Sequence, residues 1–454
     1  MRHPPFLALL VGAAFLLRIA FAATQPTAPV YQERSGDESR YLKLGYDLIS
    51  GRSYAETGLS NAPLYPLSVG LILRPFLLPQ SAAERATLHA SEVLPPATLR
   101  DADLPIHLIR GWGALLGAAL VWIVYRGAQR LSGDERAATV AALAVAIGPA
   151  FIREAAVIGT ETMYLTLLAG GVVAAMETKD ERGAAWSGLW FGLATLTRMP
   201  PLLLPPLWVL LWWVQSRRRR SVLRVKAFRT SLALLGSFGA VLAIWALYAL
   251  LAWGRPMLVS DTSIGAVALR GALGRVTHWE IDRQTEELTG AVPSAESALP
   301  YETAFWEVFR QDPFGYLVRR AEALLGAALQ PHGTLYFSGP SLKAMLADWW
   351  QEGRSAREFR EIMRAPGFGG KALLWAFHLV ALAGGLLGAG LLQLRGRQGA
   401  GLTIVVLALL YTYGLHFWLD ANARYLFPNE PLWWMLAGVG LVWIGERVTA
   451  GGGR

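Results

Sequence analysis

Residues 5–24 read PFLALLVGAAFLLRIAFAAT, and the segment SGDESRY at positions 35–41 follows after a short connection. A run of about 20 apolar residues is long enough to cross the hydrocarbon core of a bilayer as one helix. We therefore expect a transmembrane helix over 5–24. The loop after it opens on the acidic pair Asp37 and Glu38, which this helix would hold at the membrane surface.

The composition indicates an integral membrane protein with several spans. Of the 454 residues, 54% are hydrophobic, only 17% are charged, and 18 are Trp. Soluble domains carry about 25% charged residues, whereas this chain has a positive mean hydropathy of +0.35. It contains no Cys, which excludes disulfides and thiolate metal sites.

Apolar runs of span length recur along the chain and predict an all-α fold with about ten transmembrane helices. The predicted spans are 5–24, 106–128, 136–152, 158–176, 184–198, 200–215, 230–253, 371–393, 400–418 and 430–447. The fifth and sixth spans are short and are separated by Met199-Pro200-Pro201. We interpret them as a tight hairpin, with one kinked re-entrant element as the alternative.

Basic residues orient these spans. The segment 217–229 contains seven Lys or Arg and no acid, which is typical of a cytoplasmic loop. Counting spans outward from it places both termini in the cytoplasm and the long loops 25–105 and 254–370 on the opposite face. Most of the formal net charge of +9 then lies on the cytoplasmic face. There it favours contact with anionic lipids over nucleic-acid binding.

The first span has one alternative interpretation. Ala20-Phe21-Ala22 resembles a signal-peptidase site, so the span could be a signal peptide that is removed. Its removal would make the span count and the loop charges inconsistent with the orientation above. We therefore treat 1–454 as a single polytopic membrane domain.

The first outer loop, 25–105, is predicted to be partly helical. Apolar residues recur at three and four positions over 38–50, which predicts a helix that ends at Gly51. Two prolines within 61–67 favour an extended segment, and residues 67–78 are apolar enough to lie in the membrane interface.

The second outer loop, 254–370, contains the amphipathic stretch 304–328. Its charges, which include Arg319, Arg320 and Glu322, argue against an eleventh span. A helix on the membrane surface fits them better. The stretch 342–363 has the same character. We thus expect two long non-cytoplasmic loops that carry membrane-surface helices.

Asp37 and Glu38 are the first candidates for chemistry, because acids at the end of a span are costly without a role. One carboxylate would be the general base, and the other would orient the acceptor or a cation. The alternative is structural, since acids favour the first turn of a helix.

Three further charged residues are predicted at the same outer level. Glu161 stands at the outer start of the fourth span, Arg198 at the outer end of the fifth, and Arg424 between the last two. Guanidinium groups bind phosphate bidentately, so this grouping suits chemistry on a phosphate-linked substrate. The alternatives are a helix cap for Glu161, and for Arg424 an ion pair with Asp420 or a contact with lipid headgroups.

Other site classes find little support. Arg153 and Glu154 are adjacent and could pair with each other for structural reasons. No GxxxxGK[ST] motif occurs, and no GxGxxG lies between a strand and a helix. The seven His residues include no HExxH pattern, so a zinc site built on histidines is improbable.

At these positions the chain resembles the membrane-embedded GT-C glycosyltransferases that use polyprenyl-phosphate sugars. It is most similar to bacterial relatives of protein O-mannosyltransferases and to the aminoarabinose transferase of lipid A. The similarity runs in order through an acidic first-loop motif, a proline segment, an acidic motif that opens the fourth helix, a GLA-x-LTR-x-P signature and an RY-x-x-P-x-EP segment. These are residues 37–54, 63–67, 159–162, 188–201 and 424–431.

The resemblance implies roles for single residues. Asp37 would be the catalytic base with Glu38 in support, and Glu161 would line the same pocket. Arg198 and Arg424, with the neighbouring Tyr425, would bind the donor phosphate. No cofactor is implied with certainty, and a divalent cation is allowed for without any residue pattern that indicates one.

The implied reaction moves a hexosyl or pentosyl group from a polyprenyl-phosphate donor to a lipid, glycan or protein acceptor. It would take place on the periplasmic or exterior face of a multi-pass bacterial plasma membrane protein. The chain lacks the longer soluble C-terminal part of the lipid A enzymes and the lumenal module of eukaryotic mannosyltransferases, which leaves the acceptor open. A transporter or flippase of a lipid-linked substrate is the main rival, and a non-catalytic membrane subunit is a third reading.

Overall fold

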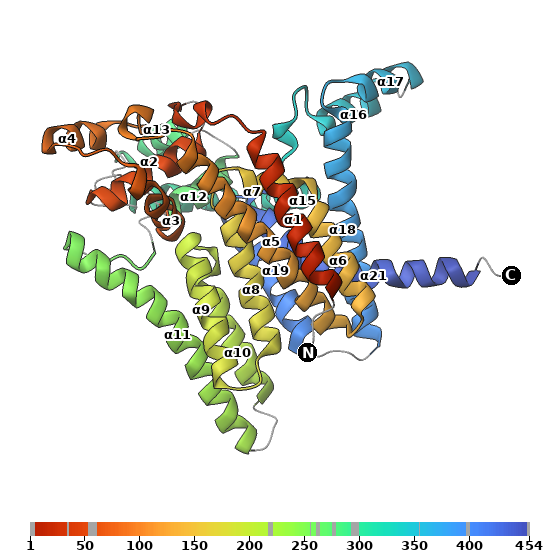
Figure 1. The fold of residues 1–454 in the computed structure, drawn as a ribbon. Helices are drawn as coiled ribbons and strands as arrows, with labels where there is room; N and C mark the ends of the chain where they lie inside the picture. Colours follow the sequence, from red (N-terminus) through yellow and green to blue (C-terminus); the bar gives the residue numbers. More distant parts are fainter. Residues whose placement is uncertain are drawn as a thin grey trace.

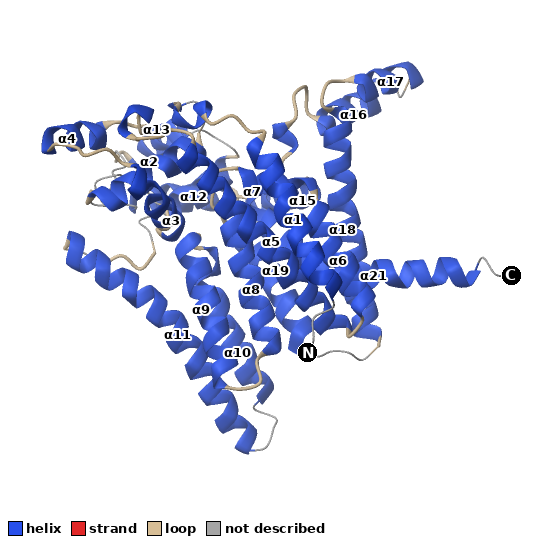
Figure 2. Ribbon diagram, viewed as in Figure 1, coloured by secondary structure: helices blue, strands red, loops and turns tan. Residues whose placement is uncertain are grey.

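A computed structural model describes residues 5–33, 36–52, 61–216, 221–254, 256–259, 264–274, 278–291, 299–353, 355–395 and 400–451. Within these ranges the regular structure is helical, as Figure 2 shows, apart from one isolated bridge between Leu77 and Leu99. The predicted all-α fold is therefore confirmed. The arginine run 217–220 and the motif residue Tyr54 lie outside the described residues.

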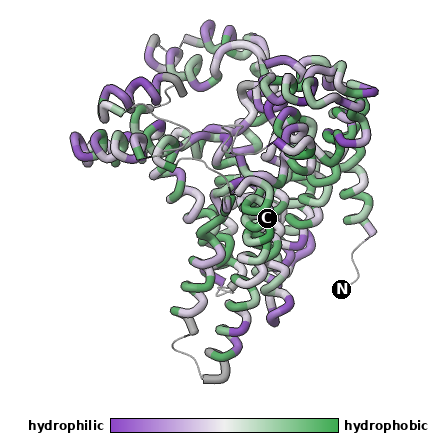
Figure 3. The backbone as a smooth tube through the Cα atoms, turned by 90° about the vertical axis from the view of Figure 1, so that its left-hand side faces the viewer, coloured by the Kyte–Doolittle hydropathy of each residue, from purple (hydrophilic) through white to green (hydrophobic). Residues whose placement is uncertain are grey.

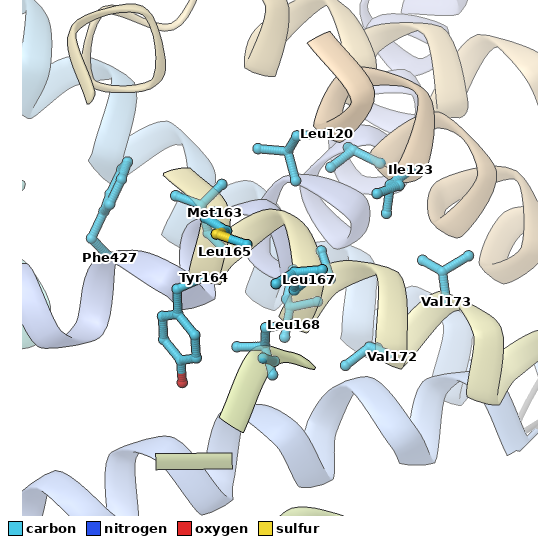
Figure 4. Packing of buried hydrophobic residues seen from close by; sticks show 14 of the residues in the cluster. Leu120, Ile123, Met163, Tyr164, Leu165, Leu167, Leu168, Val172, Val173 and Phe427 are labelled. Carbon is cyan, nitrogen blue, oxygen red and sulfur yellow. The ribbon is translucent and has the colours of Figure 1, made fainter. Parts of the chain in front are cut away.

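The predicted spans correspond to the long helices of one bundle (Figure 1). They are α1 (Pro5–Ala23), α5 (Leu104–Ser132), α6 (Glu135–Ile147), α8 (Glu161–Glu177), α9 (Glu181–Thr197), α10 (Leu204–Ser216), α11 (Ser221–Trp253), α18 (Phe368–Leu394), α19 (Ala400–Trp418) and α21 (Glu430–Gly451). α8 is buried along almost its whole length. Figure 4 shows Leu165 and Leu167 of α8 gathered with Leu120 and Ile123 of α5 in the main apolar cluster.

The number of ten spans is not confirmed. By length and composition, five helices in the described ranges could cross a membrane, or six if one bent pair counts as a single span. Several predicted spans are too short for that test, including α8 and α9 with 17 residues each. The predicted break at Met199-Pro200-Pro201 is present as the 3-10 helix η5 (Pro200–Leu203), which separates α9 from α10.

The third predicted span, 136–152, is wrong as a single helix. It is the bent pair, in which α6 and α7 (Pro149–Ala156) meet at an angle of 49°. Pro149 has no N–H to donate to the carbonyl of Val145, and its ring disfavours a continuous helix. A broken helix in a bilayer must then find other donors for its carbonyls.

Arg18 of α1 supplies these donors. Its side chain is fully buried and donates to the carbonyls of Val145 and Ala146 at 2.8 and 3.0 Å. Gly117 leaves the room, because a Cβ there would lie 2.6 Å from Nε of Arg18. The arginine that interrupts the first apolar run thus completes the end of α6.

Both outer loops lie at one end of the bundle, opposite the end at which α10 stops and α11 starts (Figure 1). The first contributes α2 (Asp37–Ser50), α3 (Leu64–Leu73) and α4 (Ala82–Ala90). The second contributes α12 (Ile264–Leu273), α13 (His278–Thr289), α14 (Leu299–Gln311), α15 (Pro313–Leu329), α16 (Leu342–Glu352) and α17 (Ala356–Arg364). Figure 3 shows hydrophilic residues concentrated at this end. Which side of a membrane it faces stays a prediction, and so does the placement of the termini.

In the outer loops, the structure confirms one predicted helix and corrects three other predicted segments. The predicted helix over 38–50 is confirmed as α2, which ends at Gly51 in the left-handed conformation. Residues 61–67 are not extended, because α3 begins at Leu64 and tolerates Pro66 in its first turn. The stretch 304–328 is split at Asp312, whose carboxylate caps α15. The stretch 342–363 is likewise two helices, α16 and α17.

Candidate active site

Arg424 is the centre of the charged cluster that the fold assembles. It lies in the short helix α20 (Ala423–Leu426), where the side chain of Asn422 accepts the N–H of Arg424 at 3.0 Å. Its Nη1 lies 2.5 Å from Oδ2 of Asp37, and its Nε donates to Oε1 of Glu161. The first outer loop, the start of α8 and the last helices therefore meet at one guanidinium.

Glu161 is the buried member of the cluster. Its side chain is only 2% exposed, and its Oε1 also lies 3.2 Å from Nη2 of Arg198 at the end of α9. Its Oε2 is buried without a hydrogen-bond partner among the described residues. A Cβ at Gly159 would lie 2.8 Å from that oxygen, so the glycine makes space for the carboxylate. Two arginines therefore share one oxygen of Glu161.

Glu38 follows Asp37 of the charged cluster but bonds to the backbone and not to an arginine. Its Oε1 accepts the backbone N–H of Ile158 at 3.1 Å. This bond ties the first turn of α2 to the segment that precedes α8. Asp37, Glu161, Arg198 and Arg424 thus come together as predicted. The bond from Ile158 to Glu38 holds the start of α2 beside the start of α8.

A cavity of about 200 Å³ opens next to Arg198. Its polar wall is formed by Arg198 with Tyr164 and Tyr425. The ring centroids of the two tyrosines lie 5.9 and 5.8 Å from the Arg198 guanidinium carbon. Its apolar wall includes Pro200 and Val267. The cavity therefore offers a cation and an apolar surface side by side.

Sequence reasoning missed the part of the second outer loop that reaches this cavity. Arg270 of α12 donates to the hydroxyl of Tyr425 at 2.8 Å and lies 2.6 Å from Oδ2 of Asp420. The suggested pair between Arg424 and Asp420 is therefore wrong. Nothing around Arg270 in the sequence signals this contact, because α12 comes from a loop without a motif.

A second polar cluster lies at the end of α7. Glu154 is buried and lies 3.1 Å from Nε2 of His332, and it accepts the hydroxyl of Tyr336 at 2.5 Å. The Arg153 guanidinium stacks over the Tyr336 ring at 3.4 Å, so the suggested pair of Arg153 with Glu154 is also wrong. Burial and the Glu154 carboxylate raise the pKa of Tyr336, which keeps its phenol protonated. This cluster anchors η6 (Thr334–Tyr336) beside the site.

The electrostatics keep Arg424 charged. Burial alone would lower the pKa of Arg424, but the carboxylates of Glu161 and Asp37 raise it overall. Burial also raises the pKa of Tyr41, which lines the cavity and stays a neutral phenol. The site therefore combines permanent cations with neutral aromatic hydroxyls.

The carboxylates are not arranged as a metal centre in the described ranges. There, no group of three or more His, Asp or Glu side chains is placed to hold a metal ion. Asp37 and Glu161 face arginines, and Glu38 faces a backbone N–H.

Part of the chain matches a known protein family. Residues 105–245 match the family model described as dolichyl-phosphate-mannose-protein mannosyltransferase. This range includes Glu161 and Arg198 and stops before Arg424. A search of curated proteins gave no significant match.

Two solved structures of an archaeal oligosaccharyltransferase share the fold. AglB from Archaeoglobus fulgidus, in complex with an inhibitory peptide and a dolichol-phosphate, matches with a TM-score of 0.52 at 11% identity. The match covers 98% of this chain and 51% of AglB. The apo oligosaccharyltransferase from A. fulgidus matches with a TM-score of 0.50 at 10% identity, over 95% of this chain and 50% of that chain. The chain thus spans about half the length of these structures. At these identities the likeness shows a shared fold.

Proposed function

We propose that this protein is a glycosyltransferase that takes a sugar from a polyprenyl-phosphate donor at the non-cytoplasmic face of a bacterial plasma membrane. The observation that carries the proposal is the convergence of Arg198 and Arg424 with Asp37 and Glu161 beside an amphipathic cavity. The names of the related proteins agree with it. One family description contains dolichyl-phosphate-mannose, and one solved structure holds a dolichol-phosphate.

The cavity suits an amphipathic donor. A phosphate group needs donors such as the guanidinium of Arg198, whereas a prenyl chain needs an apolar surface such as Pro200 and Val267. A donor that joins phosphate to prenyl satisfies both walls at once. A small soluble sugar phosphate would leave the apolar wall exposed to water.

The reaction follows from the positions of the acid and the arginines. Asp37 takes the proton of an acceptor hydroxyl, and the acceptor oxygen attacks the anomeric carbon of the sugar. The bond between that carbon and the phosphate oxygen breaks, and its electron pair stays on the phosphate. Arg198 and Arg424 stabilise the polyprenyl phosphate, which gains one negative charge as it leaves.

The acceptor is a hydroxyl-bearing lipid, glycan or protein segment that approaches Asp37. Asp37 is 35% exposed, so its carboxylate is accessible from the outer surface. This accessibility favours a separate acceptor over water trapped in the bundle. It also fits the position of α2 at the end of the bundle that carries both outer loops (Figure 1).

Purified protein in liposomes with a labelled polyprenyl-phosphate sugar, and with a membrane extract of the host as the source of the acceptor, tests the proposal. We expect the label to leave the lipid and the polyprenyl phosphate to accumulate, and Asp37→Asn to stop both. If the labelled donor is recovered intact on the other leaflet, the protein is a flippase instead. If neither release nor movement occurs with any sugar, the donor class is wrong.

A further inference from the structure

The two carboxylates on Arg424 differ in how firmly they are held. Glu161 is 2% exposed and is bound by both Arg198 and Arg424. Asp37 is 35% exposed and contacts only Arg424 among the described ion pairs. Exposed ion pairs contribute little to stability because water competes for both partners. Asp37 is therefore the partner of Arg424 that another anion can replace.

The charges of the resting cluster balance. Arg198 and Arg424 carry two positive charges, and Asp37 and Glu161 carry two negative charges. A phosphate group that enters beside Arg198 adds a negative charge close to Asp37. Neighbouring like charges raise the free energy of the site, so either the phosphate stays out or one carboxylate moves away.

The resting contact also restrains the base. Oδ2 of Asp37 lies 2.5 Å from Nη1 of Arg424. The guanidinium therefore occupies the side of the carboxylate from which Oδ2 would accept a proton. As long as the pair persists, Asp37 is held against Arg424, and this oxygen is not presented to an acceptor hydroxyl.

We propose that the donor phosphate displaces Asp37 from Arg424, and that this exchange releases the base only when a donor is bound. The inference rests on the proposed function. Arg424 passes from Asp37 to a phosphate oxygen while Glu161 keeps both arginines in place. Asp37 then faces the acceptor without a guanidinium partner. Donor binding therefore precedes deprotonation of the acceptor, and an empty site does not activate a nucleophile.

Glu161 acts in this scheme as a positioning residue. It is buried in the first turn of α8, and its Oε1 is shared by two guanidinium groups. A carboxylate in this position cannot reach an acceptor without abandoning both arginines. Its role is to keep the two cations close enough to receive one phosphate.

The experiment measures binding of farnesyl monophosphate to purified protein in detergent, with farnesol as the blank. Asp37→Asn removes the competing charge and is expected to bind the phosphate about two- to fivefold more tightly than the unchanged protein. Glu33→Gln is the matched control. It removes the same charge from the same loop, four residues away, at an exposed position outside the charged cluster. It should leave affinity unchanged, whereas Arg424→Gln should weaken it.

The outcomes separate this inference from the proposed function. Tighter binding by Asp37→Asn alone supports the exchange. Equal binding by Asp37→Asn and the unchanged protein, with weaker binding by Arg424→Gln, keeps the phosphate site but overturns the exchange. Equal tightening by Asp37→Asn and Glu33→Gln shows a general charge effect and also overturns it. Failure of the unchanged protein to bind farnesyl monophosphate above farnesol rejects the phosphate site itself.

Discussion

Arginine side chains occur in two kinds of surroundings in this protein, and the contrast separates framework from site. At the bend between α6 and α7, the fully buried Arg18 donates to three backbone carbonyls. In the charged cluster, Arg198 and Arg424 face carboxylates beside a cavity. Carbonyls are fixed parts of the chain, whereas a half-exposed carboxylate can be replaced. An arginine of the first kind holds the fold, and one of the second kind can receive a ligand.

Other buried cations belong to the framework kind. Arg110 donates to the carbonyls of Gln25 and Pro26 at 2.8 and 3.0 Å. Arg320 donates to carbonyls at the end of α19 and to that of Gly271 in α12. Lys371 donates to three consecutive carbonyls from Ser338 onward at 2.7–3.0 Å. Each of these side chains fastens an outer loop to the bundle.

The largest expected effect is loss of the fold when a framework cation is removed. Arg18→Met keeps the length of the side chain but removes its donors. The variant should lose about 1–3 kcal/mol for each carbonyl of α6 left without a partner. Thermal unfolding in detergent measures this loss, with Arg283→Met on exposed α13 as the control. An unchanged unfolding temperature would show that Arg18 is not a framework residue.

The second prediction tests the site side of the contrast. Asp37→Asn retains the shape of the side chain but not its basicity, so turnover should fall by roughly 10²–10⁴. The amount of folded protein should not change, because Asn is a comparable residue at a helix start. Sugar release per mole of folded protein is the measurement. Turnover near that of the unchanged protein would remove Asp37 as the base.

The third prediction concerns Arg424. Arg424→Ala should lower turnover by about 10²–10³, as loss of one donor to a developing charge does. Arg424→Lys should fall between Ala and the unchanged protein, because Lys retains the charge and loses the planar fork. Both variants should still insert and fold. A loss of folded protein equal to that of Arg18→Met would move Arg424 into the framework group.

The smallest expected effect concerns the space around Glu161. Gly159→Ala places a methyl group against Oε2, where the distance would be 2.8 Å. Displacing the carboxylate shifts both arginines and should lower turnover about tenfold. Gly236→Ala in α11, where a Cβ meets nothing within 4 Å, is the control. Equal activity of the two variants would show that the carboxylate tolerates movement.

The sequence indicated the charged cluster because its members stand at the ends of apolar runs. Asp37, Glu161, Arg198 and Arg424 each follow or precede a predicted span, and spans of one topology bring such residues to one level. The helical fold followed from the same runs. The apolar runs thus predicted both the helical bundle and the level at which its charged residues meet.

The partners of these residues could not be predicted in this way. Pairing of Arg270 with Asp420, and of Glu154 with His332, joins loops that are far apart in the chain. Charges predicted at one level do not show which acid pairs with which arginine, so the contact of Asp37 with Arg424 was not predicted either. The bend at Pro149 was also missed, since the apolar run continues through it.

The order in which the chain is made gives the shared guanidinium a further consequence. Arg424 and Glu161 are separated by 263 residues, so a ribosome releases the acid long before its partner. Until the last helices insert, Glu161 can form its ion pair with Arg198, but neither Glu161 nor Asp37 can form its ion pair with Arg424. The charged centre therefore closes as one of the last events of biogenesis. A nascent chain that stalls before α20 cannot form the complete charged cluster, because it lacks Arg424.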